Sequence, residues 1–283
     1  MSTNGCTRAH MDLTIPQSPF GGRVIKTREL SGLRLVDGVY SAKTKVPGHS
    51  HEQAVFCIAL NGACSEVYAN KVREYQAFTV EFLPSHQSHS LAFTGAETRA
   101  FSVDVSSYWL ERAREYSLRL ENSVHCHGGL LSGLFMKLYS EFLQMDSASP
   151  LAIEGLTLEM LAEASRRQVN VSDRTPPRWL TRARELVHAQ FSEHLTIAHL
   201  ATSVGVHPVH LAREFRKFYR CTIGEYVRQL RIEHACRALY ASDAPLAAIA
   251  SAAGFSDQSH FSRTFKRLIG VTPAEYRSAF HPR

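Results

Sequence analysis

Residues 246–268, LAAIASAAGFSDQSHFSRTFKRL, decide how the rest of this chain is interpreted. A short apolar helix is expected first, and it ends at Gly254 because glycine adopts the left-handed conformation that closes a helix without strain. A second helix is expected from Ser256 to Leu268, with Phe261 and Phe265 four residues apart on its inner face. The stretch therefore predicts a helix-turn-helix unit.

The same plan occurs a second time at residues 197–218, IAHLATSVGVHPVHLAREFRKF, with its turn at Gly205. Between the two units, Thr222 to Ser242 reads as one helix of about 20 residues, which spans roughly 30 Å. That length is close to one turn of B-DNA, so both second helices can enter successive major-groove segments on one face of a duplex. The alternative is a pair of ordinary helical hairpins with solvated surfaces.

The second helix of each unit has an outer face of small or polar residues, which fits the DNA major groove. These faces carry Val209, Ala212, Arg213 and Arg216 in the first unit, and Gln258, Ser259, Ser262 and Arg263 in the second. We expect methyl contacts from Val209 and Ala212, which leaves the polar readout of the first unit mainly to Arg213. Four further cations are better placed for phosphates, or serve as solubilising charge: Lys217, Arg220, Arg228 and Lys266.

The net charge of +6 lies in the C-terminal part of the chain. From residue 175 onward there are 15 Lys and Arg against 8 Asp and Glu, whereas residues 1–174 carry 17 against 18. Thirteen of the 15 cations are Arg, which suits bidentate recognition of guanine edges and phosphates better than Lys does. The balance favours a polyanionic partner about as well as it favours a solvated basic face.

Residues 177–277 resemble the AraC/XylS family of bacterial transcription regulators. The most specific stretch is AGFSDQSHFSRTFKRLIGVTPAEYR, residues 253–277. The resemblance implies that the two outer faces described above contact bases, and that the N-terminal domain senses a small-molecule effector. It also implies dimerisation through helices that follow the sensor.

The N-terminal part predicts a different fold. Between Gly32 and Val105, short runs rich in Val, Phe, Leu, Tyr and Thr alternate with turn residues, which is typical of an antiparallel β-barrel or sandwich. Two helices follow, over about 130–143 and 151–167, and residues 169–177 predict a linker. We therefore expect two domains, a barrel with helices at 1–168 and an all-α double helix-turn-helix domain at 178–283, with units at about 195–218 and 246–268.

Histidines in two stretches of the N-terminal part resemble the motifs of the cupin barrel. The first is Gly48-His-Ser-His51 and the second runs from Pro84 to His89. In metal-binding cupins such histidines and a glutamate bind a divalent ion, but the glutamate position here is Val55. His49, His51 and His89 are expected to converge, with His86 in place of the carboxylate, either as a metal site or as walls of an effector pocket. We interpret the short His125-Cys126-His127 stretch as a loop.

The sequence thus predicts a transcription regulator, an activator or a repressor, that binds double-stranded DNA and a small-molecule effector. We expect a homodimer in the cytoplasm, contact with RNA polymerase and no membrane partner, because no apolar run approaches the length of a membrane-spanning helix and no export signal is visible. No enzymatic activity and no certain cofactor are expected, a divalent metal in the barrel being the one candidate. The alternatives are a metal-dependent cupin enzyme with a helical appendage and a scaffold that uses its helices only for protein contacts.

Overall fold

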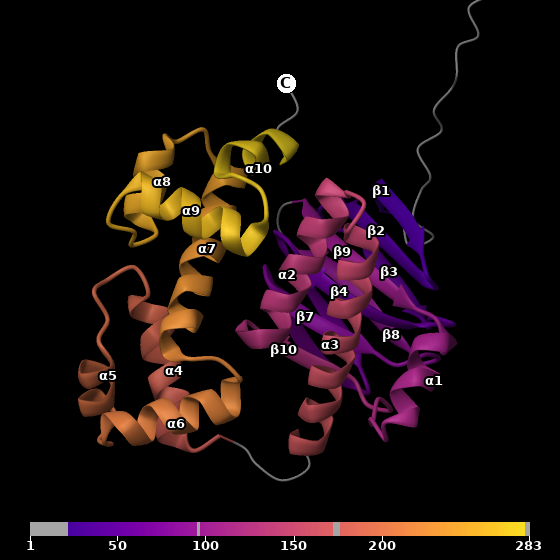
Figure 1. Ribbon diagram of the computed structural model, residues 1–283, viewed down its shortest axis with the longest axis horizontal. Helices are drawn as coiled ribbons and strands as arrows, with labels where there is room; N and C mark the ends of the chain where they lie inside the picture. The colour runs from indigo at the N-terminus through magenta and orange to yellow at the C-terminus, as the bar shows by residue number, and fades with distance from the viewer. Residues whose placement is uncertain (1–21, 95–96, 172–175, 281–283) are drawn as a thin grey trace, which may run out of the picture.

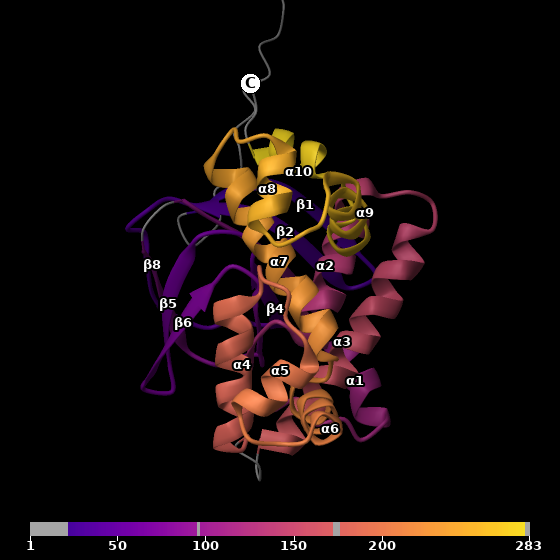
Figure 2. The same cartoon turned by 90° about the vertical axis from the view of Figure 1, so that its left-hand side faces the viewer.

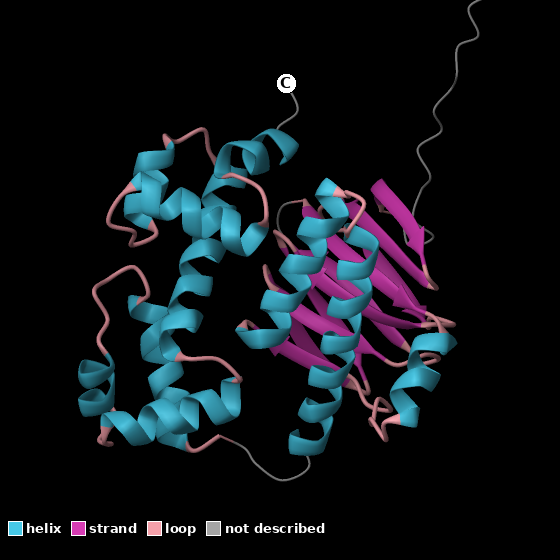
Figure 3. Cartoon of the chain, viewed as in Figure 1, coloured by secondary structure: helices cyan, strands magenta, loops and turns pink. Residues whose placement is uncertain are grey.

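The computed structural model describes residues 22–94, 97–171 and 176–280. A part rich in β-strands lies beside a helical part, and the two are in contact (Figure 1). Figure 3 shows that all the strands belong to the first part and that the second is entirely helical. This is the division between an antiparallel sheet domain and an all-α domain that the sequence predicts.

The strands form two antiparallel sheets. Six strands pair in the order β1-β2-β9-β4-β7-β10 and four in the order β3-β8-β5-β6. Their bounds are β1 Arg23–Leu30, β2 Leu33–Tyr40, β3 Lys45–His49, β4 Ala54–Ala59, β5 Ala63–Tyr68, β6 Lys71–Gln76, β7 Thr79–Leu83, β8 His89–Thr94, β9 Thr98–Val105 and β10 Val124–His127.

The described strands do not form a closed barrel, so our expectation of a cupin-like barrel is corrected. The two sheets face each other across a cavity, but no pairing joins them along either edge within the described residues. Strand β6 ends the smaller sheet with Lys71 and Glu74 exposed, and charged side chains of this kind discourage further pairing at an edge. At one edge of the larger sheet lies β10, the His125-Cys126-His127 stretch, which is a strand paired with β7 and not a loop.

The helices bear out both predicted helix-turn-helix units to within a few residues. The helices of the sheet part are α1 Ser107–Glu115, α2 Gly129–Gln144 and α3 Ser149–Val171, and those of the helical part are α4 Arg178–Gln190, α5 Ile197–Ser203, α6 Pro208–Tyr219, α7 Ile223–Ala241, α8 Leu246–Ala252, α9 Gln258–Ile269 and α10 Pro273–Phe280. Of the predicted linker at 169–177, the first residues belong to α3, and residues 172–175 lie outside the described residues.

Strand β4 illustrates how alternation builds the two faces of the larger sheet. Phe56 and Ile58 are fully buried beneath α2, where the ring of Phe56 lies 6.3 Å from that of Phe135. Val55 and Cys57 point the opposite way and line the cavity between the sheets. Since side chains alternate along a strand, one sheet supplies both the support for the helices and one wall of the cavity.

The chain has two main hydrophobic cores, and they do not follow its two parts. The larger core runs from the six-stranded sheet through α2 to α7, α8, α9 and α10, and it includes Phe135, Leu239 and Phe261. The second core holds α4, α5 and α6 against the first half of α7, with Leu211 and Phe215 at its centre. The second helix-turn-helix unit is therefore packed on the sheet part, whereas the first has a core of its own.

Gly270 lies where the end of α9 contacts α2. It ends α9 with a φ of +86°, its carbonyl accepts a hydrogen bond from Gln144 Nε2 at 2.6 Å, and a Cβ placed on it would fall 1.5 Å from Ser140 Oγ. Gly205 has a similar φ of +71° at the turn of the first unit, but a Cβ there would meet no atom within 4 Å. The two glycines thus share a backbone requirement and differ in packing.

We expect Gly270→Ala to lower the free energy of unfolding more than Gly205→Ala. Each substitution carries the strain of a left-handed residue, about 1–2 kcal/mol. Only Gly270→Ala also forces α9 away from Ser140. Urea titrations of the two variants measure the difference, and equal losses would show that α9 does not pack against α2 as described.

Candidate nucleic-acid interface and ligand cavity

The second helices of the two units, α6 and α9, begin at capped positions. His207 Nδ1 accepts a hydrogen bond from the amide of Val209 at 3.3 Å, and Pro208 follows in the first turn of α6. At the start of α9, Asp257 Oδ1 accepts from the amide of His260 at 2.6 Å. Such caps satisfy amides that have no partner inside the helix, so both helices have well-defined N-terminal ends.

The outer faces of α6 and α9 lie at the surface, as predicted for base contacts. Among the eight predicted residues, Val209, Arg213, Arg216, Gln258, Ser259 and Arg263 are exposed, and Ala212 and Ser262 are half-buried. Among the described residues, the polar contacts of the Arg213 side chain are within its own helix, to Glu214 Oε1 at 3.4 Å and His210 Nδ1 at 3.1 Å. Exposed pairs of this kind contribute little free energy, so the guanidinium can exchange them for a base edge.

The four cations predicted to contact phosphate occupy different surroundings. Arg228 and Lys266 are exposed, and Lys217 Nζ lies 3.7 Å from Glu214 Oε2 on its own helix. Arg220 instead ends α6 and places its Nε 3.7 Å from Glu163 Oε2, on α3 of the sheet part. Arg220 therefore connects the two parts of the chain.

Helix α7 holds the two units apart. It has 19 residues, so it spans roughly 30 Å. It begins with a capping box in which Thr222 and Glu225 exchange hydrogen bonds. Figure 2 looks nearly along α6 and α9 at once, one near each end of α7, so their axes run in similar directions.

Polar contacts tie the helical part to α2, α3 and β10. Besides Arg220 with Glu163 and Gln144 with Gly270, they include the Gly129 amide with Gln229 Oε1 at 2.9 Å and His127 Nε2 with Glu233 Oε2 at 3.2 Å. Glu233 is 1% exposed, and its Oε1 has no hydrogen-bond partner among the described residues. Strand β10 thus reaches α7 with the side chain of His127.

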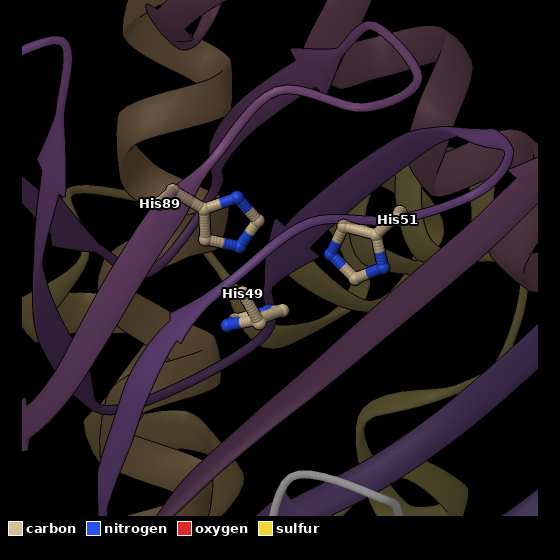
Figure 4. Close-up of side chains that lie close together, drawn as sticks. All are labelled: His49, His51 and His89. Carbon is tan, nitrogen blue, oxygen red and sulfur yellow. The ribbon is translucent and has the colours of Figure 1, made fainter.

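The cavity between the two sheets has a volume of about 1020 Å³. His49, His51 and His89 meet at one side of it, and Figure 4 shows the three imidazoles turned toward one another. One ring nitrogen from each lies within 4.8 Å of the others, and the ring centres are 4.3–5.1 Å apart. The predicted convergence of these three residues is what the structure contains.

The three imidazoles are arranged to accept a ligand. His49 Nδ1 lies 2.9 Å from the carbonyl of Pro47, and this contact orients the ring. Burial lowers the pKa of His51 to about 4 and that of His89 to about 3, with neighbouring histidines adding to the effect. Both rings are therefore neutral near pH 7, the state in which imidazole coordinates a metal or accepts a hydrogen bond.

His86 does not join the other three histidines, contrary to our expectation. It is exposed, its φ is +62°, and its amide donates to the carbonyl of His51 at 2.7 Å. Because His86 is neither among the described lining residues nor in the cluster of His49, His51 and His89, it does not substitute for the carboxylate missing at Val55. The donors present fit three ligands of a divalent ion, with no fourth ligand in the group the structure brings together.

A pair of buried glutamates in the cavity wall escaped our sequence analysis. The hydroxyl of Tyr75 lies within hydrogen-bonding distance of Glu66 on β5 and of Glu81 on β7, and it can donate its one proton to either. Arg73 lies 3.0 Å from Glu81 and 3.8 Å from Glu66. Burial raises the pKa of Glu66, and it raises that of Glu81 further because Glu66 is adjacent. In the sequence, the feature that could have indicated this pair is Glu81, an acidic residue within the otherwise mostly apolar run that forms β7.

Comparisons with known proteins agree with the geometry of the helical part. A family model described as a helix-turn-helix domain matches residues 200–279. A probable transcription factor, PqrA of Proteus vulgaris, is 40% identical over 88 residues, which cover 31% of this chain and 72% of PqrA. A putative AraC-like transcription regulator of Streptomyces antibioticus is 32% identical over 154 residues, covering 50% of this chain and 49% of that protein.

The chain belongs to the AraC family of transcription regulators. The aligned segment spans about half of the Streptomyces relative's own length. Among solved structures, ToxT of Vibrio cholerae O395 is 13% identical and covers 89% of this regulator and 99% of ToxT, with a TM-score of 0.39. No helix among the described residues is both long and apolar enough to cross a membrane.

Burial of the His89 imidazole leads us to expect that the free energy of unfolding depends on pH. The pKa of this imidazole falls from 6.5 to about 3 on folding, so the unfolded chain binds one more proton between those values, and lowering the pH destabilises the fold. Between pH 7.5 and pH 5 this contributes a loss of about 2 kcal/mol. We expect His89→Gln to remove that part of the pH dependence, as measured by urea unfolding at the two pH values.

The exposed His86 provides the matched control in the same segment. His86→Gln should retain the pH dependence of the unchanged chain. If His89→Gln retains it as well, the imidazole of His89 is not buried in the neutral form.

Proposed function

We propose that this regulator binds one DNA duplex with α6 and α9 together and that a small molecule in the cavity between the sheets modulates that binding. The observation that carries the proposal is the pair of exposed helix faces held at the two ends of α7. Because roughly 30 Å is close to a helical turn of B-DNA, the two helices suit consecutive major-groove segments.

The residues proposed to read bases are those of the two outer faces. On α6, Arg213 and Arg216 offer guanidinium groups for guanine edges, while Val209 and Ala212 offer apolar contact with thymine methyl groups. On α9, Gln258 suits adenine, Arg263 suits guanine, and Ser259 and Ser262 donate to either kind of base edge or to phosphate.

Phosphate contacts are proposed for Lys217, Arg228 and Lys266, because they are exposed cations of α6, α7 and α9 outside the proposed base-reading positions. Arg220 is proposed to do the same only when it leaves Glu163. In that arrangement one arginine is shared by the sheet part and DNA, so binding of the duplex and contact between the two parts of the chain compete for it.

The cupin-like part, with residues 1–168 as its proposed extent, is assigned the role of effector sensor. The cavity is supported for this role by its size and by the convergence of the imidazoles of His49, His51 and His89 at one side of it. These three residues would hold a divalent ion if one binds, and an ion there would anchor an oxygen or nitrogen atom of the effector. The coupling to DNA is supported by the contacts of β10 and α2 with α7 and α9.

A homodimer, a contact with RNA polymerase and a place in the cytoplasm remain predictions. The apolar stripe of α2 lies within the larger core, so a dimer contact would use other surfaces of the sheet part. The relatives reported above are named as transcription regulators, and nothing in them favours the alternative of a cupin enzyme with a helical appendage. Whether the chain activates or represses depends on the position of its sites relative to promoters.

The base-reading proposal predicts losses that depend on DNA sequence. Arg213→Ala and Arg263→Ala should each weaken binding to a site identified by genome-wide mapping by about 1–3 kcal/mol and relax the base preference there. Fluorescence anisotropy with that site and with single-base variants measures both effects.

Lys217→Ala is the comparison variant on the same helix as Arg213. It should weaken binding to all sequences alike and reduce the slope of log K against log salt by about 1. Full affinity and unchanged preference in both arginine variants would contradict the proposal, and a complete absence of salt-dependent DNA binding would favour a scaffold that contacts only proteins.

A further inference from the structure

The wall of the cavity is predominantly acidic. Five carboxylates are among the side chains that line it, whereas Arg34 is the single Lys or Arg among the described lining residues. The acids are Glu29, Glu52, Glu66, Glu81 and Asp104. Arg34 pairs with Asp104, with 3.4 Å between Nη1 and Oδ2. Arg73, which is not a lining residue, offsets one carboxylate of the Glu66 and Glu81 pair. A ligand that enters the cavity still meets more carboxyl groups than cationic groups.

Three buried polar atoms of the lining residues lack partners among the described residues: Ser106 Oγ, Glu66 Oε1 and His89 Nδ1. Oε1 of Glu66 and Nδ1 of His89 are each enclosed without a hydrogen bond, in side chains that are 0% and 4% exposed. Arg73 lies 3.0 Å from Glu81 Oε1 and 3.8 Å from Glu66 Oε2, so its contact with Glu66 is to the other carboxyl oxygen. Leaving such groups unpaired costs free energy, so a ligand that donates N–H groups to them gains affinity.

The rest of the cavity suits an organic body. The rings of Tyr40 and Phe93 stack in its wall with centres 4.4 Å apart and planes 7° apart. Aliphatic side chains such as Val55, Leu83 and Leu91 complete the lining. A volume of about 1020 Å³ is at the upper end of the range for small-molecule sites, and a bare metal ion at the three histidines would leave most of it empty.

We propose that the effector of this regulator is an organic cation, with an apolar or aromatic body and a protonated amine or amidinium group that donates to Glu66 and His89. This inference rests on the proposed function, since it names the ligand class of the same cavity. A carboxylic acid of the same size would place its own negative charge beside the carboxyl groups of Glu66, Glu81 and Asp104, and we expect it to be excluded.

The test compares isosteric probes of opposite charge on the full-length chain. Isothermal titration calorimetry is performed with naphthylethylamine, with naphthylacetate and, separately, with zinc chloride, on protein purified without a histidine tag. We expect saturable binding of the amine and at least about tenfold weaker binding of the acid. Equal or tighter binding of the acid, or binding of zinc without binding of the amine, would overturn the proposal.

Variants locate the charge. Glu66→Gln should weaken the amine at least about tenfold, because a charged hydrogen bond is lost. Glu74→Gln, an exposed glutamate on the neighbouring strand β6, should leave it unchanged. Asp104→Asn, which releases Arg34, should also weaken the amine and serves if Glu66→Gln does not fold by circular dichroism. Equal affinity for the amine in Glu74→Gln and in both cavity variants would contradict the assignment.

Salt-dependent DNA binding of the same preparation is measured in parallel. If the protein binds DNA but not the amine, the proposed ligand class is wrong and the proposed function stands. If the protein does not bind DNA, the proposed function itself is wrong.

Discussion

The packing of α2 between the six-stranded sheet and the second helix-turn-helix unit is the constraint on which the rest of the structure depends. On one side Phe135 meets Phe56 and Phe101 of the sheet, at 6.3 Å and 5.6 Å between ring centres. On the other, the same core continues into Leu239 of α7 and Phe261 of α9. Since protein interiors are close-packed, a shift of the sheet cannot leave α9 where it is.

The two helix-turn-helix units, similar in sequence, are therefore held differently. The second shares its core with the sheet and with α2, and Gly270 allows α9 to end directly against Ser140. The first is joined to the sheet part by α7 and by polar contacts such as that of Arg220 with Glu163. A change in the cavity has a short route to α7, because β7 carries Glu81 in the cavity wall and pairs with β10, whose His127 contacts Glu233.

The sequence predicts local features of this arrangement well because they depend on spacing. Gly205 and Gly254, with paired apolar residues four apart, are sufficient to place α5, α6, α8 and α9. The His-x-His pattern brings His49 and His51 to one side of the chain, and His89 follows from a neighbouring strand. The sequence does not predict tertiary packing in the same way, since the apolar stripe of α2 would be the same whether it packed against the sheet, a dimer partner or α9.

Three details show where periodicity stops being informative. Strand β10 is short and polar, and it becomes a strand only because the edge of β7 is available to pair with it. Glu66 and Glu81 belong to neither histidine stretch, and they reach the cavity through the pairing of strands. His86 follows its motif in sequence but lies in a left-handed turn, which no spacing reveals.

Hydrogen exchange followed by mass spectrometry tests the shared core most directly. Phe135→Ala removes a large side chain from the core between the sheet and α9, and its effect is compared with that of Leu211→Ala in the core of the first unit. We expect Phe135→Ala to reduce protection in α9 and in the six-stranded sheet together, while α6 keeps its protection. We expect Leu211→Ala to reduce protection in α6, while α9 and the sheet keep theirs. Loss of protection in α6 and α9 together, independent of the sheet, would contradict these expectations.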